Sequence, residues 1–554
     1  MNRPVLLFVL TVTVFCSSGY ALWPQPRQLS TGTTPLILSS DFSIVLSIAK
    51  PPQDLVDAVN RTMTFLHNDR LERLIVGRSA ADRPLLASAL SLNSLDVALG
   101  EGATIRSVMQ ETLRPLEERQ EGYSLTVPAD SGRARLEANT TLGLVRGLTT
   151  FSQMWYFEEG EGRVYMVNAP VEVVDEPAFA YRGLMLDTCR NFFPVDDIKR
   201  FLDTMSWVKL NIFHWHVVDS QSFPLQVPGF EEIALKGAYS ASSVYSPDDI
   251  QDLVTYAGER GIDVVVKIDT PGHTAIISES HPEHVACPQS TPWATFAEEP
   301  PAGQLRLTPP TVNFTAGLLS KIAKMFPSPL FSAGGDEVNV PCYAQDPDMQ
   351  QYINASGLTL NETLQTFVSA MQSVLIAEGK TPLLSEEMVL ESNLTVSNET
   401  IVLVWKSSND IPPVVEKGLR VIFAASDYMF LDCGAGEWIG ADPTGWCDPF
   451  KTWQKTYSVD PFANLTTKQT SRIVGGQHLL WTEQSSPANM DSITWPRAAA
   501  GAEVFWTGSR RGNVSVALPR LHDVAFRMVQ RGVRAIPLQP EWCALRPGVC
   551  DLTA

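Results

Sequence analysis

The sequence has little positive charge, and beyond its N-terminus it lacks long hydrophobic runs. Its 61 aspartates and glutamates outnumber 42 lysines and arginines, so the formal net charge is −19 and the pI is near 4.9. Because nucleic-acid phosphates bind to basic surfaces, this balance argues against nucleic acid as a partner. No stretch beyond the N-terminus approaches the length of a membrane helix, so no membrane span is expected.

Cysteine is also scarce, and no cysteine has the spacing of a metal ligand. We therefore predict neither a metal nor another cofactor. Cys16 belongs to the N-terminal apolar segment, which leaves seven cysteines. In an oxidising compartment we expect three pairs and a free, buried Cys189. The expected pairs are Cys433 with Cys447, Cys543 with Cys550, and Cys287 with Cys342.

The N-terminus has the pattern of a secretory signal peptide, predicted for residues 1–21. Arg3 precedes an apolar core of about ten residues, and small residues at 18–21 form a cleavage site. Such a core is too short to span a bilayer. The chain also contains nine Asn-X-Ser/Thr sequons, an excess that suggests a secreted glycoprotein, although some are expected to stay unmodified. They are Asn60, Asn139, Asn313, Asn354, Asn361, Asn393, Asn398, Asn464 and Asn513.

Residues 22–174 contain short apolar runs separated by loops, which predicts a smaller α+β domain. Residues 142–151 have the composition of a helix packed against strands such as 122–127. This part presents no obvious chemistry of its own. We expect it to support the larger domain.

Residues 175–554 change to β-branched runs alternating with amphipathic stretches, the pattern of βα units around a parallel sheet. Helices are predicted at 196–209 and from Ser246, where Ser, Pro and two acids follow one another. Eight strands in this order predict an α/β protein: a (β/α)8 TIM barrel preceded by the smaller α+β domain, with a C-terminal helical segment. The expected strands are 182–187, 210–218, 262–269, 330–335, 382–387, 401–405, 420–425 and 473–481.

Chemical groups gather where these strands end, which is where barrel enzymes place their active sites. Sugar pockets need tryptophan walls and charged hydrogen-bond partners, and cleaving a glycosidic bond needs a carboxylic acid that donates a proton. His214 and His216 are expected to be structural. The strand ends carry Asp187, Asp219, Asp269, His273, Asp336, Glu337, Trp405, Trp481 and Glu483.

Several segments in the same order resemble glycoside hydrolase family 20, and most of all its fungal secreted β-N-acetylhexosaminidases. The similarity begins at residues 22–27 and continues through residues 527–532, so it covers nearly the whole mature chain. A lone Asp-Glu pair is common by chance, whereas the ordered set is specific. The segments are Arg182–Thr188, His214–Pro224, Asp269–His273, Gly334–Val338 and Trp495–Arg497.

This resemblance implies a substrate-assisted retaining mechanism, in which the 2-acetamido oxygen of the sugar attacks the anomeric carbon. It implies that Glu337 is the general acid and later the base, and that Asp336 accepts the acetamide N–H. Asp219 and His273 would form a relay to Glu337. Arg182 would hold the 3- and 4-hydroxyls with help from Asp432 and Glu483, while Trp405 and Trp481 would wall the pocket. Either tryptophan alone would as readily be a core residue.

Three positions depart from the family pattern, and each touches the acetamide pocket or its support. Ser385 stands where the fifth strand usually has Trp. Phe430 stands where a Tyr hydroxyl usually donates to the acetamide oxygen, and Lys267 stands where the third strand commonly has Glu. A missing hydrogen bond of this kind costs about 10²–10³ in rate.

Three functions fit the sequence to different degrees. An exo-acting β-N-acetylhexosaminidase is favoured by the retained Asp336-Glu337 pair. A secreted amino-sugar-binding paralogue with weak or altered catalysis is favoured by the three departures, and a storage glycoprotein would explain only the sequons. The expected substrates are β-linked N-acetylhexosaminides of chitooligosaccharides or glycoprotein glycans. A homodimer is the first expectation, and secretion is favoured, with vacuolar delivery as the alternative.

Overall fold

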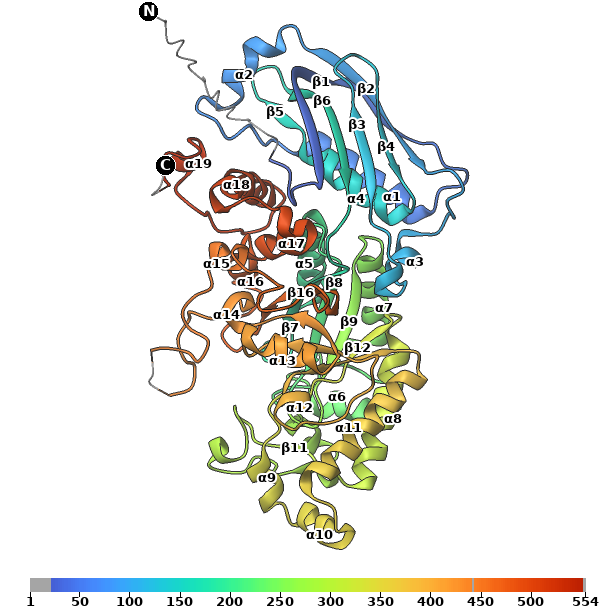
Figure 1. Cartoon of the computed structure of the whole chain (residues 1–554), viewed down its shortest axis with the longest axis vertical. Coiled ribbons are helices and arrows are strands. Elements are labelled where there is room, and N and C mark those ends of the chain that lie inside the picture. The colour runs from blue at the N-terminus through green and yellow to red at the C-terminus, as the bar shows by residue number, and fades with distance from the viewer. Residues whose placement is uncertain (1–20, 441–442, 552–554) are drawn as a thin grey trace, which may run out of the picture.

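The computed structural model describes residues 21–440 and 443–551. Apart from Ala21, the predicted signal peptide with Cys16 lies outside these residues. A sheet with helices on one face lies above a closed barrel (Figure 1). This agrees with the predicted fold, a (β/α)8 barrel preceded by a smaller α+β unit.

The N-terminal unit is built on a six-stranded mixed sheet with the order β1-β2-β4-β3-β6-β5, in which β1 also pairs with β6. The helices α1 and α4 lie between this sheet and the barrel (Figure 1). Nearly every residue of α4 is buried, because the helix is covered from both sides. The predicted packing of residues 142–151 against 122–127 is confirmed. The elements are β1 Gln28–Leu46, α1 Gln53–Asn68, α2 Arg78–Leu86, β2 Leu90–Leu99, α3 Val108–Thr112, β3 Tyr123–Val127, β4 Arg133–Ala138, α4 Thr141–Gln153, β5 Tyr156–Glu158 and β6 Arg163–Asp175.

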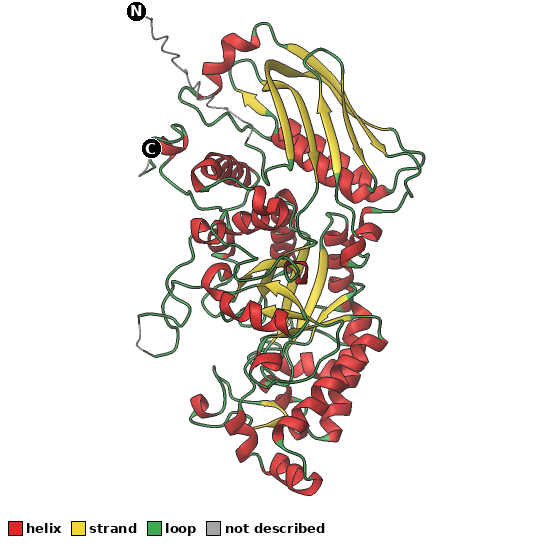
Figure 2. Ribbon diagram, in the orientation of Figure 1, coloured by secondary structure: helices red, strands yellow, loops and turns green. Residues whose placement is uncertain are grey.

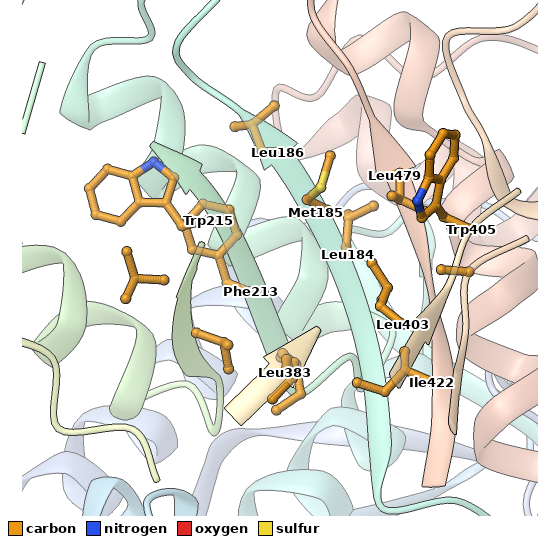
Figure 3. Packing of buried hydrophobic residues seen from close by; sticks show 14 of the residues in the cluster. Leu184, Met185, Leu186, Phe213, Trp215, Leu383, Leu403, Trp405, Ile422 and Leu479 are labelled. Atoms are coloured by element: carbon orange, nitrogen blue, oxygen red, sulfur yellow. The ribbon is translucent and has the colours of Figure 1, made fainter. Parts of the chain in front are cut away.

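All eight predicted barrel strands are present, and they close a parallel ring (Figure 2). They are almost continuously buried, because helices cover the outside and side chains fill the inside. Figure 3 shows this packing around Leu184, Phe213 and Leu403. The strands are β7 Tyr181–Asp187, β8 Ile212–Val218, β9 Asp263–Ile268, β12 Leu330–Ser332, β13 Thr381–Ser385, β14 Ile401–Val404, β15 Arg420–Phe423 and β16 Ile473–Leu480.

The two predicted barrel helices are α5 and α7. Ser246 caps α7: its Oγ accepts the Asp249 N–H, while the Asp249 carboxylate accepts the Ser246 N–H. The chain continues past the barrel into α18 and α19. The helices of this part are α5 Val195–Trp207, α6 Glu231–Gly237, α7 Pro247–Gly258, α8 Pro309–Met325, α9 Val340–Gln345, α10 Pro347–Ser356, α11 Leu360–Ala377, α12 Glu387–Leu390, α13 Ile411–Glu416, α14 Ser426–Met429, α15 Trp453–Tyr457, α16 Met490–Thr494, α17 Arg497–Thr507, α18 Val514–Gln530 and α19 Glu541–Ala544.

A buried ionic network joins the N-terminal unit to the start of the barrel. The Glu121 carboxylate bonds Arg146 at 2.7 Å and Arg182 at 2.6 Å, and none of the three side chains is more than 1% exposed. Burial raises the pKa of Glu121, but the two guanidinium groups outweigh it and lower the pKa to about 2. Lys209 makes a similar buried pair with Asp175, at 3.0 Å. These contacts belong to the amino-terminal end of the barrel.

The cysteine pairing agrees with the prediction. Disulfides join Cys287 to Cys342, Cys433 to Cys447, and Cys543 to Cys550. Cys189 is a free, buried thiol. Among the helices of the described ranges, none is long and apolar enough to cross a membrane.

Candidate active site

The loops at the carboxyl ends of the barrel strands surround a cavity of about 640 Å³. Both acids and aromatic rings line it, as a sugar site requires. The loop closed by the Cys433–Cys447 disulfide forms part of its mouth. Most of the predicted site residues lie here together: His273, Asp336, Glu337, Trp405, Asp432, Trp481 and Glu483.

Two glycines allow the chain to bring Asp336 and Glu337 to the cavity. Gly334 and Gly335 have φ angles of 68° and 97°, which favour glycine. A Cβ atom on Gly334 would lie 1.4 Å from Asp269 Oδ1, so no other residue fits there. Glu337 itself has a left-handed φ of 53°, and His273 one of 56°. Such strain in residues other than glycine is typical of functional sites.

A hydrogen-bonded relay runs from Glu337 into the protein. His273 Nε2 lies 3.2 Å from Glu337 Oε2, and His273 Nδ1 lies 3.0 Å from Asp219 Oδ1. Burial lowers the pKa of His273, but the Asp219 carboxylate outweighs it, so the pKa is raised well above its usual value. The Asp219 carboxylate therefore favours the protonated form of His273, which faces Glu337. His216 bonds the other oxygen of Asp219 at 2.7 Å, while His214 bonds Gln477, and neither lines the cavity.

Lys267 forms a second buried ionic group, directly beneath Asp336. Its Nζ contacts Asp336 Oδ2 and lies 3.0 Å from Asp269 Oδ2. Burial raises the pKa of Asp336, but Lys267 outweighs it, and the pKa is lowered. Asp336 is consequently an anion in the resting site.

Aromatic side chains form one wall of the cavity. Trp405 is 9% exposed, and its Nε1 donates to Glu387 Oε2 at 3.0 Å. Phe430 stacks on Trp405 with 6.2 Å between ring centroids, and the edge of Trp446 meets both rings. Ser385, in contrast, is buried and does not line the cavity. The sequence pattern alone missed Trp446, because its place depends on the disulfide loop.

The prediction that Arg182 binds sugar hydroxyls is wrong. Arg182 begins β7 at the opposite end of the barrel, is 0% exposed and bonds Glu121. The arginine of the cavity is Arg190, three residues past the end of β7. The rule that chemistry sits at the carboxyl ends of barrel strands would have favoured Arg190.

Arg190 is surrounded by carboxyl groups. It bonds Asp187 at 3.1 Å, Asp219 at 3.0 Å and Glu299 at 2.5 Å, and lies 3.5 Å from Glu483. Asp219, His273 and Glu299 could offer three ligand atoms to a metal ion, but Arg190 already supplies the positive charge between the two carboxylates.

Two acids that line the cavity have raised pKa values. Burial raises the pKa of Asp432 to about 7. Burial also raises the pKa of Glu483 well above its usual value, against the opposing charge of Arg190. Such carboxyl groups both donate and accept hydrogen bonds, which suits a ring of sugar hydroxyls.

Comparison with known proteins supports the interpretation of this cavity as a sugar site. Residues 179–509 match the catalytic domain of glycosyl hydrolase family 20, and residues 22–154 match a β-acetyl hexosaminidase-like domain. The β-hexosaminidase of Arthroderma benhamiae is 35% identical over 456 residues, 78% of this chain and 74% of that protein. The chitooligosaccharidolytic β-N-acetylglucosaminidase of Bombyx mori is 32% identical over 575 residues, 99% of this chain and 92% of that protein. In the solved structures, the chitobiase of Flavobacterium johnsoniae has a TM-score of 0.73 and 25% identity, covering 93% of this chain and 73% of its own. The chain therefore belongs to glycosyl hydrolase family 20 and is a glycosidase.

Proposed function

We propose that this glycosidase is an exo-acting β-N-acetylhexosaminidase with a substrate-assisted retaining mechanism. One observation carries the proposal: Asp336 and Glu337 are adjacent and line the same cavity, where Asp336 pairs with Lys267 and Glu337 contacts His273. A binding protein that had lost turnover would have no need for this arrangement.

The two acids act on different atoms of the substrate. Glu337 gives its proton to the glycosidic oxygen, while the acetamide oxygen of the sugar attacks the anomeric carbon from the other face. The His273 cation, at 3.2 Å, then stabilises the carboxylate that Glu337 has become. Asp336 accepts the acetamide N–H and stabilises the positive charge of the oxazolinium ring. Water attacks next, with Glu337 as the base, so the two inversions give net retention.

The rest of the cavity recognises the sugar. Arg190 takes the role of the hydroxyl-binding arginine, and Asp432 and Glu483 complete the hydrogen bonds to the hydroxyls. Trp405 and Trp481 cover the apolar faces of the sugar and its acetamide.

Hydrolysis of a chromogenic β-N-acetylglucosaminide by the purified chain tests the function. Release of N-acetylglucosamine from the non-reducing end of a chitooligosaccharide, with the β-anomer formed first, would support an exo-acting retaining enzyme. Saturable sugar binding without turnover would instead favour the amino-sugar-binding alternative.

Separate substitutions of Arg190 and Arg182 distinguish a residue of the active site from a residue that only stabilises the fold. Arg190→Ala is expected to lower kcat/KM by roughly 10- to 100-fold, because charged hydrogen bonds to the sugar are lost. Arg182→Met is expected to leave kcat/KM unchanged but to lower the free energy of unfolding by about 3–5 kcal/mol, since it leaves Glu121 buried without one partner. Steady-state kinetics and urea unfolding measure the two effects. A loss of kcat/KM in folded Arg182→Met would contradict this assignment.

Phe430→Tyr tests the missing hydroxyl. The ring of Phe430 lines the cavity beside Trp405, so a tyrosine hydroxyl there would meet the acetamide region. We expect kcat to rise by at least about tenfold, because a new donor to the acetamide oxygen orients the nucleophile. An unchanged kcat would show that the hydroxyl is not what limits this enzyme.

We also propose the substrates, the secretion and the assembly of this enzyme. The name of the Bombyx mori relative supports chitooligosaccharides as substrates, with glycoprotein glycans as the alternative. All nine sequon asparagines are exposed, which supports glycosylation and secretion. We also propose residues 22–174 and 175–554 as the two domains and a homodimer as the assembled form, with no nucleic acid as partner.

A further inference from the structure

Lys267 is a charged residue that the mechanism above does not use, although it lies directly behind the site. It belongs to β9, which ends just before Asp269, and its side chain is 1% exposed. Besides Asp336 and Asp269, it meets the Trp481 ring, 4.9 Å from the centroid. Lys267 does not line the cavity, so substrate meets Asp336 and not the lysine.

The two oxygens of Asp336 have different surroundings. Oδ2 pairs with Lys267, whereas Oδ1 is buried and has no hydrogen-bond partner of good geometry among the described residues. The Ser385 hydroxyl is near enough to contribute to the lowered pKa of Asp336. A buried carboxylate oxygen without a partner is costly unless a ligand supplies a donor. Asp336 itself lines the cavity, so its carboxylate group lies at the substrate-facing side of Lys267.

We propose that Lys267 is a positioning residue that holds Asp336 as a carboxylate in a fixed orientation at the wall of the cavity, where it meets the 2-acetamido group of the sugar. This inference rests on the proposed function. The ammonium fixes one oxygen of Asp336 and thereby the orientation of the other. In the family pattern this position commonly carries Glu, whereas this chain has Lys267.

The charge of Lys267 is needed because Asp336 does not face it alone. Asp269 contacts the same ammonium group, so removing the cation would leave two buried carboxylates sharing one space. Burial and the Asp336 charge already raise the pKa of Asp269, and loss of the Lys267 charge would raise the pKa of both acids. A protonated Asp336 would no longer stabilise positive charge on the acetamide. The other titratable or charged groups that face this pair are His214, His216, His273, Glu337 and Glu387.

The pH dependence of kcat/KM tests the proposal in Lys267→Met, with Lys267→Arg as the charge-conserving variant. In Lys267→Met we expect the acidic limb to move up by about one pH unit or more, which is a tenfold loss of kcat/KM on that limb. In Lys267→Arg the limb should stay at the wild-type position. An acidic limb of Lys267→Met that coincides with the wild type would overturn the proposal.

Lys209→Met is the matched control, because it removes an equally buried lysine from an aspartate pair at the other end of the barrel. It is expected to lower the Tm and leave the acidic limb in place. If the limb moved in Lys209→Met as in Lys267→Met, a general loss of packing would explain both, and the positioning role would fail.

A carboxyl ¹³C NMR titration of the wild type needs neither turnover nor a folded Lys267 variant. The Asp336 resonance is identified by its absence in Asp336→Asn. We expect it to stay ionised below about pH 3.9, the ordinary aspartate value, and protonation above that value would overturn the proposal. A wild type without hydrolytic activity would instead refute the proposed function, while the titration would still show whether Asp336 is held as a carboxylate.

Discussion

Glu337→Gln is expected to lower kcat by about 10²–10⁴, the usual contribution of a positioned general acid. The amide has the size of the carboxyl group and can keep a contact with His273, but it cannot give a proton to the leaving oxygen. The KM for the sugar should change little, because Glu337 acts on the glycosidic oxygen and not on the ring hydroxyls.

Comparing substrates with different leaving groups makes this experiment more specific for the acid role of Glu337. An aryl glycoside with a strongly acidic phenol needs little protonation to leave, so the glycosylation step should suffer far less for it than for a chitooligosaccharide. Glu391→Gln is a suitable control, since Glu391 is 62% exposed and pairs with Lys406 outside the barrel core. Equal losses for good and poor leaving groups, in single-turnover measurements of glycosylation, would contradict the assignment of Glu337 as acid.

Asp336→Asn is expected to lower kcat by about 10²–10³, comparable with the loss of one group that stabilises transition-state charge. The substitution keeps the shape of the side chain but removes the negative charge beside the forming oxazolinium ring. Since that charge develops mainly after the ground state, kcat should fall more than the affinity for substrate.

The same variant also changes the surroundings of Lys267, so stability must be followed separately. Circular dichroism and the urea midpoint would show whether the protein is intact. A folded Asp336→Asn enzyme that kept more than about a tenth of the wild-type kcat would rule out the proposed role, given the expected size of the effect.

The barrel could be predicted from sequence because its strands obey a local rule. A strand buried on both faces appears as a short β-branched run, and Asp263–Ile268 is an example in which every residue is buried. The ends of the strands differed from the prediction by a few residues, most at β12, where Gly334 and Gly335 turn the chain away from the ring. Left-handed glycine turns of this kind are not visible in an apolar pattern.

The roles of the two arginines could not be predicted correctly from the sequence. Arg182 lies at the start of the first barrel strand and Arg190 just past its end, and motif similarity singled out the first of them. Only the fold assigns Arg182 to Glu121 of the N-terminal unit and Arg190 to Asp219 of the cavity. Glu121 and Asp219 are distant in sequence from the arginines that they bind, so no local sequence pattern reveals either ion pair.

The sequence by itself determined the order of the barrel strands, the ordered family motifs, the disulfide partners and the identity of the two adjacent acids. These depend on local periodicity, on spacing along the chain and on residue type. Only the tertiary structure decided which arginine lines the cavity and that Lys267 pairs with Asp336. Charge pairing depends on distance in space. Residues on strands that are far apart in the sequence come close together only when the barrel closes.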